Sequence, residues 1–480
     1  KVSTWGSLGV SATPDHPFVA TKVSDLSMVR YPDGVSWRGM SRRDGGRSRV
    51  DPMSISAKWC PAGELEEGDL VWSPIPRPTG PSVDFLENRW KSAHVRGPHF
   101  DGLPVNRETL RLMGLWLAEG SGNVIFAFCG DEEHTLVVET ADLLRRYTPC
   151  EPKLLDLRVK RRQVNGFNVQ IHSVEAGRFF RNHFGDGCRN KRIPNELMEA
   201  EGLDLMPLVG ALVDGDGHLA LDTNHVSYAT TSEELARQVH TVLLRNGVAA
   251  SLSLTTKGAY LVNAGGEDGR RWRMLCGGAT AGPEQGLTRY GFFDKGHVAF
   301  AVKSVERRSF EGPVYNLEVQ DDHSYVLSGP MAVSNCVFHR DIILDVPFGE
   351  DWDVKWKGVC PTCRLRTYPI YYKYSEQQAS AYGPGRAKVL FLLEDEVIHW
   401  SRYSPCYDYQ TEVMTRGGWK RIVDVDLDVD EVATRSEGGF LEWQRPLNKV
   451  VKPYTGPMWV AKGQRVDLSV TAHHKLWVRG

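Results

Sequence analysis

Two short apolar stretches near the middle of the chain end in the same way. Residues 112–120 are LMGLWLAEG and residues 209–217 are VGALVDGDG, so each run closes on an acidic residue followed by glycine. The pattern predicts two helices that a glycine terminates without steric cost. We expect Glu119 and Asp216 side by side, as divalent-metal cleavage of a phosphodiester requires. Small residues that would let the helices approach closely are Gly114, Ala118, Gly210 and Ala211.

The residues after each acidic helix repeat the same order of elements. Apolar strand-like segments follow at 124–128 and 225–229, and amphipathic helical patterns follow at 133–147 and 232–247. Either acidic stretch alone has an ordinary interpretation, because Asp-Gly-Asp-Gly also suits a turn or part of a calcium loop. Two copies in one order indicate an internal repeat.

With this repeat, residues 105–280 resemble the two-repeat LAGLIDADG homing endonucleases. Residues 190–194, NKRIP, are similar to the lysine block that this family places before its second acidic motif. The resemblance implies an α/β fold whose strands form a saddle over double-stranded DNA, acting as a monomer. It also implies that Glu119 and Asp216 hold Mg²⁺ and that Lys191 stabilises charge near the site.

A cluster of cations between the two motifs suits contacts to DNA phosphates. We expect these residues to place positive charge on one face of a strand, although a solvated charge run is an equal alternative. They are Arg158, Lys160, Arg161 and Arg162.

Composition changes the picture little. The 480 residues predict several domains, and a hydrophobic content of 41% supports folded cores. A net charge of −2 means that any DNA surface is a local patch. Nine scattered cysteines and no recognisable signal peptide or membrane span favour a reducing, cytoplasmic setting. The missing initial methionine and the apolar run at the end suggest a fragment of a longer reading frame.

Both flanks of the endonuclease-like region, residues 1–90 and 290–335, have the alternating apolar positions and turns of β structure. They resemble the two halves of a Hint (hedgehog/intein) protein-splicing domain interrupted by an endonuclease, as in large inteins. Thr13 and His16 match the family's B block, and His323 matches its F block.

The end of this unit, Asn335-Cys336, matches a splice junction. The resemblance implies that the Cys336 thiol attacks a thioester and that Asn335 then cyclises and cuts the chain, with His323 polarising that step. Two departures predict slow splicing, because Ser334 stands where the family usually has histidine and Asn316 where it often has aspartate. The initiating nucleophile of this unit is expected upstream of the sequence.

Residues 406–480 resemble the opening of a second intein. Cys406 would be its first nucleophile, and Thr471 with His474 forms another B block. A coincidental strand pair led by cysteine is the alternative.

Residues 336–405 would be the host, or extein, sequence that serves as splicing substrate with the other flank. A Cys-x-x-His pair, Cys336 and His339, precedes a Cys-x-x-Cys pair, Cys360 and Cys363, at a spacing that suits a structural zinc site.

The end of that segment, LEDEVIH and the SP before Cys406, faintly resembles phage portal proteins. The predicted architecture is therefore multidomain: a split all-β Hint domain, an inserted α/β two-repeat endonuclease, a small α/β or β extein, and part of a second β Hint domain. The alternative function is a catalytically inactive DNA-binding relic inside a phage structural protein.

Overall fold

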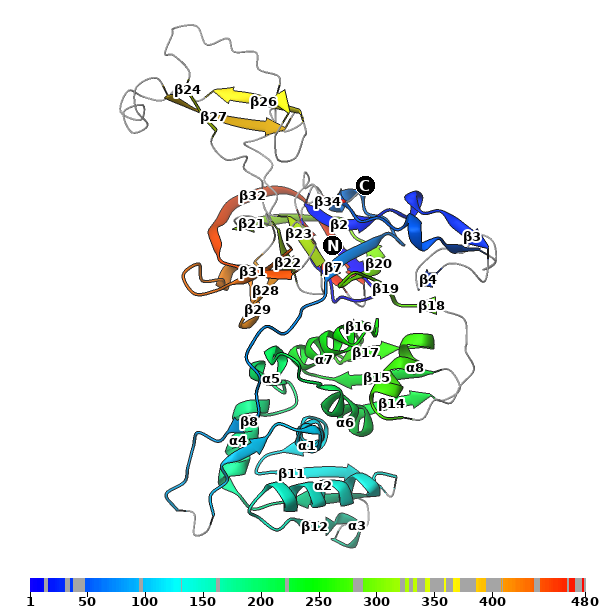
Figure 1. Cartoon of the computed structure of the whole chain (residues 1–480), viewed down its shortest axis with the longest axis vertical. Coiled ribbons are helices and arrows are strands. Elements are labelled where there is room, and N and C mark those ends of the chain that lie inside the picture. The colour runs from blue at the N-terminus through cyan, green and yellow to red at the C-terminus, as the bar shows by residue number, and fades with distance from the viewer. Residues whose placement is uncertain are drawn as a thin grey trace.

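A computed structural model describes most of the chain. The residues outside the description are 13–15, 31–34, 38–47, 95–97, 131, 161–164, 221–223, 279–287, 320–323, 328–330, 335–341, 346–357, 360–365, 372–385, 394–406, 408, 436–440, 464–465, 471–476 and 479–480. Figure 1 shows a central β unit, an α/β region on one side of it, and a small separate sheet on the other. The chain is thus a mixed α/β protein of several domains. Among the described residues, no helix has the length and apolar character needed to cross a membrane.

The α/β region contains one arrangement twice. The first copy consists of α1 (Arg107–Glu119), β10 (Gly120–Ser121), β11 (Ile125–Cys129), α2 (His134–Tyr147), β12 (Lys153–Asp156), α3 (Leu157–Lys160), β13 (Gly166–Gln170) and α4 (Val174–Phe184). After α5 (Asn195–Glu199), the second copy consists of α6 (Met206–Asp216), β14 (Gly217–Ala220), β15 (His225–Thr230), α7 (Glu233–Arg245), β16 (Ser251–Leu254), β17 (Tyr260–Ala264) and α8 (Gly266–Leu275). The antiparallel sheets have matching orders, β10-β11-β13-β12 and β14-β15-β17-β16. This confirms the internal repeat.

Local sequence explains where the helices of this region begin. The Asn106 side chain accepts hydrogen bonds from the backbone N–H of Glu108 and Thr109, and the Thr109 hydroxyl accepts one from the Asn106 N–H in return. This capping box starts α1. Ser232 caps α7, because its side chain accepts a hydrogen bond from the Leu235 N–H at 3.2 Å.

The β unit is a 13-stranded sheet assembled from both ends of the chain. Its main path runs β1-β20-β7-β2-β23-β22-β28-β30-β31. These strands are β1 (Val2–Thr4), β2 (Pro17–Thr21), β7 (Leu70–Pro74), β20 (His297–Val305), β22 (Ser324–Leu327), β23 (Met331–Ser334), β28 (Glu412–Thr415), β30 (Val432–Arg435) and β31 (Leu441–Gln444). The side branches are β6 (Lys58–Pro61), β19 (Gly291–Asp294), β29 (Gly418–Arg421) and β34 (Trp477–Val478).

Shorter sheets complete the fold. A second part of the β unit has the order β21-β32-β33, with β21 (Arg308–Val319), β32 (Pro446–Gly463) and β33 (Val466–Val470). The separate sheet has the order β24-β27-β26-β25, with β24 (Ile342–Asp345), β25 (Gly358–Val359), β26 (Arg366–Tyr371) and β27 (Arg386–Leu393). The remaining pairs are β3 (Met28–Arg30) with β5 (Ser48–Val50), β4 (Ser36–Trp37) with β18 (Thr288–Arg289), and β8 (Phe85–Glu87) with β9 (Gly102–Pro104).

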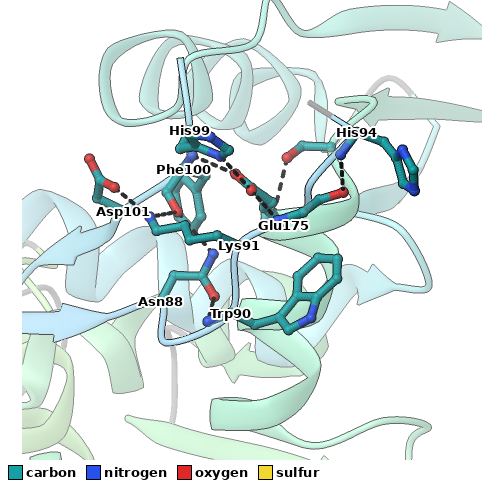
Figure 2. A network of polar contacts seen from close by, with 11 residues as sticks. Asn88, Trp90, Lys91, His94, His99, Phe100, Asp101 and Glu175 are labelled. Atoms are coloured by element: carbon teal, nitrogen blue, oxygen red, sulfur yellow. Dashed lines mark hydrogen bonds and ion pairs between the residues drawn. The ribbon is translucent and has the colours of Figure 1, made fainter. Parts of the chain in front are cut away.

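A buried carboxylate on α4 holds the segment that leads into α1 (Figure 2). Glu175 is only 1% exposed and accepts hydrogen bonds from the Ser92 N–H at 2.7 Å and the Phe100 N–H at 2.8 Å. His99 Nδ1 lies 2.7 Å from the same carboxylate. Burial by itself would raise the pKa of Glu175, but these hydrogen bonds outweigh it and lower the pKa to about 2. The entry segment is therefore fixed against the first repeat.

The segment that leaves the second repeat is also held by a buried acid, but mainly through an ion pair with an arginine. Asp268 on α8 is fully buried and pairs with Arg289 at 2.7 Å. It also accepts a hydrogen bond from the Ala249 N–H at 3.1 Å. Each repeat thus uses an acid in the first turn of its last helix to fix one connection to the β unit.

Candidate active site at the ends of α1 and α6

Helices α1 and α6 pack at backbone distance. A Cβ at Gly114 would lie 2.3 Å from the Leu208 carbonyl oxygen, so a larger residue would force the helices apart. Near the end of the interface, a Cβ at Gly215 would lie 2.7 Å from the Ala118 Cβ. The predicted close helix pair is confirmed, and it brings the ends of both helices to one place.

Two carboxylates meet at these helix ends. A Cβ at Gly215 would lie 2.8 Å from Glu119 Oε1, so the Glu119 side chain lies against the last turn of α6. Burial and, to a lesser extent, the negative charges of Asp216 and Glu133 together raise the pKa of Glu119 to about 7, against an opposing effect of Lys191. Asp216 is exposed. The protein around it nevertheless raises its pKa by desolvation, which Lys191 opposes and Glu133 reinforces.

The positive charge of Lys191 lowers the pKa of both carboxylates. Its ammonium group donates to the Ala118 carbonyl at 3.0 Å, one residue before Glu119. Desolvation lowers the pKa of Lys191, while the charges of Asp216 and Glu119 raise it. The Lys191 carbonyl accepts a hydrogen bond from the Ser232 hydroxyl at 2.6 Å, which ties the lysine to the start of α7. The structure thus brings together the three residues predicted for the active site.

Two further residues act on the site. Tyr228 is fully buried and pairs with Gly217 in the β14–β15 register, next to Asp216. Burial raises the pKa of its phenol, and the charges of Asp216 and Glu119 add to this. The alternation of residues 225–229 could have placed Tyr228 on the inner face of its strand. No sequence signal links Glu133, which precedes α2, to two carboxylates from other elements.

Asp214 has a separate role from Asp216. Its carboxylate pairs with Arg111 on α1 at 2.7 Å, and Arg111 also donates to Glu139 on α2 at 2.8 Å. Asp214 therefore links three helices, and Asp216 remains available at the helix end.

The predicted cationic strand face is wrong where the structure describes it. Strand β12 ends at Asp156, and residues 157–160 form the short helix α3. The Asp156 carboxylate accepts from the Arg158 backbone N–H at 2.9 Å and from its guanidinium at 2.8 Å, which turns the chain out of the strand. Arg158 also lies 4.4 Å from the Phe167 ring centre. The Lys160 side chain and all of 161–164 lie outside the described residues, so Arg161 and Arg162 stay predictions.

Two of the residues discussed for splicing are described. His16 is fully buried, its ring centre is 4.0 Å from that of Tyr407, and burial lowers its pKa well below the usual value. Asn316 is also fully buried, and its side-chain amide oxygen Oδ1 accepts a hydrogen bond from the Tyr325 hydroxyl at 2.6 Å. Asn316 thus occupies a hydrogen-bonded position inside the β unit.

The remaining predicted site residues lie outside the described residues. They are Thr13, His323, Asn335, Cys336, His339, Cys360, Cys363, Cys406, Thr471 and His474. The zinc site stays a prediction for the same reason. Within the described ranges, no group of three or more His, Cys, Asp or Glu residues forms a metal cluster.

The second repeat is similar to a known protein family. Residues 207–276 match the family described as "LAGLIDADG-like domain", and this range covers α6 through α8. The second repeat is therefore a LAGLIDADG-like region, and the sheet of the first repeat has the same strand order. Among solved structures, one of I-DmoI in complex with its target DNA in the presence of Mg is similar, with 11% identity and a TM-score of 0.28. The match covers 36% of this chain and 97% of that one.

Curated relatives have diverse names. The ATP-dependent DNA helicase Hel308 of Thermococcus kodakarensis is 27% identical over 367 residues, covering 68% of this chain and 31% of that protein. An iron–sulfur cluster assembly SufBD family protein of Mycobacterium tuberculosis is 26% identical over 340 residues, covering 68% of this chain and 35% of that protein. The chain spans about a third of the length of these relatives.

Proposed function

We propose that residues 105–280 cleave double-stranded DNA at a specific site with Glu119, Asp216 and Lys191. The observation that carries the proposal is the meeting of two acidic helix ends from two copies of one fold, beside a partly desolvated lysine. The negative charge of Asp216 raises the pKa of Glu119, and neighbouring carboxylates whose pKa values are raised are a common arrangement for binding a cation.

The donor set fits Mg²⁺. This ion takes oxygen ligands and is commonly bound by one or two carboxylates together with water and substrate phosphates, so a pair without a third protein ligand is sufficient. Bound Mg²⁺ would polarise the phosphate and lower the pKa of a coordinated water. Glu119 and Asp216 would hold the ion, and the Lys191 ammonium would stabilise negative charge on the phosphate.

The outer faces of the two sheets are the proposed DNA surface. On the first sheet, Lys153 pairs with Gln170, and both lie on the face opposite the buried side chains of β11 and β13. On the second sheet, exposed His218 lies on the corresponding face, where it pairs with Ser227, which is largely buried. Such mixed polar residues suit contacts to base edges and backbone over a long site.

A selection for cleaved sequences from a randomised duplex library in Mg²⁺ tests this proposal. Cleavage that is lost in Glu119→Gln and Asp216→Asn, but kept in Asp214→Asn, would support the assigned roles. Binding of Mn²⁺ alone, followed by its electron paramagnetic resonance signal, gives a second readout. DNA binding without cleavage in the unmodified chain would instead favour the inactive relic in a phage structural protein.

A second proposed function is protein splicing by the β unit. Its support is the junction strand β23, which pairs with both β2 and β22 and so lies beside His16 and Tyr325. Relatives with unrelated names, a helicase and an iron–sulfur assembly protein, each match 68% of this chain. A self-excising insert shared by different host proteins would produce such a pattern. Intact-mass spectrometry for cleavage after Asn335, absent in Asn335→Ala, tests it.

A further inference from the structure

The last helix of each repeat carries one sequence pattern at the same place in the helix. Residues 175–181 of α4 are EAGRFFR and residues 267–273 of α8 are EDGRRWR, so both read Glu-x-Gly-Arg-x-aromatic-Arg. The aromatic member is fully buried in both helices, as Phe180 and as Trp272. The correspondence between the repeats therefore extends from the order of their strands to individual side chains of their last helices.

The glycine of this pattern lets each helix approach the turn that follows the acidic helix end. A Cβ at Gly269 would lie 1.8 Å from the Asn224 carbonyl oxygen, so no side chain fits at that position. A Cβ at Gly177 would lie 3.2 Å from the Asn123 Cα, which is also a tight contact. The two helices thus contact equivalent places, just before β15 and just before β11.

The residues directly before β11 and β15 have an unusual backbone conformation. Val124 has a φ of 60° and Asn224 has a φ of 50°, so both lie in the left-handed region. This region is unfavourable for a β-branched residue, and the surrounding structure has to hold Val124 there. Both residues are buried, and the Val124 carbonyl accepts a hydrogen bond from the Ile171 N–H at 3.2 Å. The backbone after each acidic end therefore depends on its neighbours for its conformation.

The second arginine of the pattern holds the first of these turns. Arg181 Nη1 donates to the Asn123 side-chain oxygen at 3.0 Å and to the Gly122 carbonyl at 3.3 Å. Gly122 is only three residues after Glu119, and the short strand β10 between them pairs with β11. A shift of this turn would therefore move the backbone that directly follows the catalytic carboxylate.

The aromatic member of the pattern packs against the acidic helix itself. The Phe180 ring centre lies 4.9 Å from that of Trp116, which is in the last turn of α1. In the second repeat, Trp272 belongs to the same hydrophobic core as the buried residues of α6. Arg273, at the position equivalent to Arg181, is only 9% exposed. Residues 221–223 of the second turn lie outside the described residues.

We infer that the last helix of each repeat positions the catalytic carboxylate through the turn behind it. The positioning residues are Gly177 and Arg181 for Glu119, and Gly269 and Arg273 for Asp216. The inference rests on the proposed cleavage of DNA. Groups that hold a cation against a phosphate have to be fixed to within about 0.5 Å by residues that do not themselves touch the substrate. The repeated pattern supplies such residues once for each carboxylate.

The two arginines of α4 give a matched pair of variants for the turn. Arg181→Ala removes the donor to the turn, whereas Arg178→Ala removes an exposed arginine whose guanidinium lies 4.0 Å from the Trp90 ring centre. Hydrogen exchange of residues 119–128, followed by mass spectrometry without metal, compares them. Exchange should be about tenfold faster or more in Arg181→Ala, because hydrogen bonds from a charged group are lost. Equal exchange rates in the two variants would overturn the inference.

Single-turnover cleavage of a selected duplex tests the effect on chemistry. Arg181→Ala and Arg273→Ala should each lower the rate about 10- to 100-fold, with the affinity for the duplex in the absence of metal unchanged. Arg178→Ala and Arg270→Ala are the controls and should stay within about twofold of the unmodified chain. Arg181→Lys keeps one donor to the turn and should restore part of the rate. A rate that falls only together with duplex affinity and thermal stability would indicate a merely structural role and overturn the inference.

Binding of Mn²⁺ alone separates this inference from the proposed function. Arg181→Ala should weaken Mn²⁺ binding about tenfold, as measured by electron paramagnetic resonance, because residues that orient ligands affect metal affinity. If the unmodified chain binds Mn²⁺ but cleaves no duplex, the cleavage function is overturned, and a weaker affinity in the variant still supports positioning. Equal affinities would overturn positioning, and an unmodified chain that binds no Mn²⁺ would overturn both.

Discussion

The two repeats of the α/β region share their topology but differ in how they are joined to the β unit. In the first, Glu175 accepts backbone and histidine hydrogen bonds from the segment that enters the region. In the second, Asp268 pairs with Arg289 in the segment that leaves it. The two sheets have matching strand orders, whereas the partners of the two buried acids differ. The repeated fold therefore positions the carboxylates, and the unrepeated connections position that fold on its host.

Variants of Glu119 and Asp216 give the strongest test of whether the two repeats contribute equally to DNA cleavage. Glu119→Gln and Asp216→Asn should each reduce the rate of double-strand cleavage by about 100-fold or more, because each removes a charge that is proposed to hold the cation. Agarose-gel assays on a selected target would measure this. Asp214→Asn is the control and should retain most activity. Loss of cleavage of only one DNA strand would show that the repeats act separately.

The two attachments can be compared by truncating their buried acids. Glu175→Ala and Asp268→Ala should each lower the free energy of unfolding of the α/β region by about 2–4 kcal/mol, because buried donors lose their acceptor. Urea denaturation followed by tryptophan fluorescence measures the change. Glu267→Gln removes a half-exposed i,i+3 partner of Arg270 and should cost less than about 0.5 kcal/mol. A similarly small effect of Glu175→Ala would contradict its role as an anchor.

The helix interface can be tested at two glycines of similar sequence context. Gly114→Ala should destabilise by about 1–3 kcal/mol, because its Cβ would lie 2.3 Å from the Leu208 carbonyl. The prediction that Gly210 lies in this interface is wrong, since the nearest atom to a Cβ there is Cys276 Cβ at 3.4 Å. Gly210→Ala is therefore tolerated or stabilising, through helix propensity. Thermal unfolding of both variants would distinguish the two faces, and equal losses would contradict the close approach.

The raised pKa of Glu119 predicts that removing its charge slightly stabilises the fold at high pH, whereas the buried-acid variants above destabilise it. The Glu119 carboxyl group has a pKa of about 7 in the folded state and 4.5 in its ordinary state. The folded state therefore loses stability as the pH rises from 4.5 to 7. Without metal, Glu119→Gln should therefore raise the free energy of unfolding at pH 8 by about 1–2 kcal/mol and leave it unchanged at pH 4. Urea curves at both pH values check this. A variant that is less stable at pH 8 would contradict the desolvated carboxylate.

Much of the α/β region is predictable from local patterns. The acid-glycine ends, the amphipathic helices and the Ser232 cap depend on periodicity and short-range hydrogen bonds, and these carry over directly into the fold. The alternating pattern did not predict the helix at Arg158, because hydrogen bonds from Arg158 to the Asp156 carboxylate end the strand there. Glu133, Glu175 and Asp268 act across distant segments, so no local pattern indicates their partners.

The place where the α/β region leaves the β unit has a consequence for its history. Pro74 at the end of β7 lies opposite His297 at the start of β20, and these antiparallel strands are direct neighbours. The whole intervening region therefore takes the position of a hairpin turn. The intervening residues also include β19, which pairs with β20, and β18, which pairs with β4. A gene that lost the α/β region could reconnect β7 and β20 through a few residues and keep the other strands on the main path of the sheet. Gain and loss of the α/β region would thus leave the main path of the sheet in place.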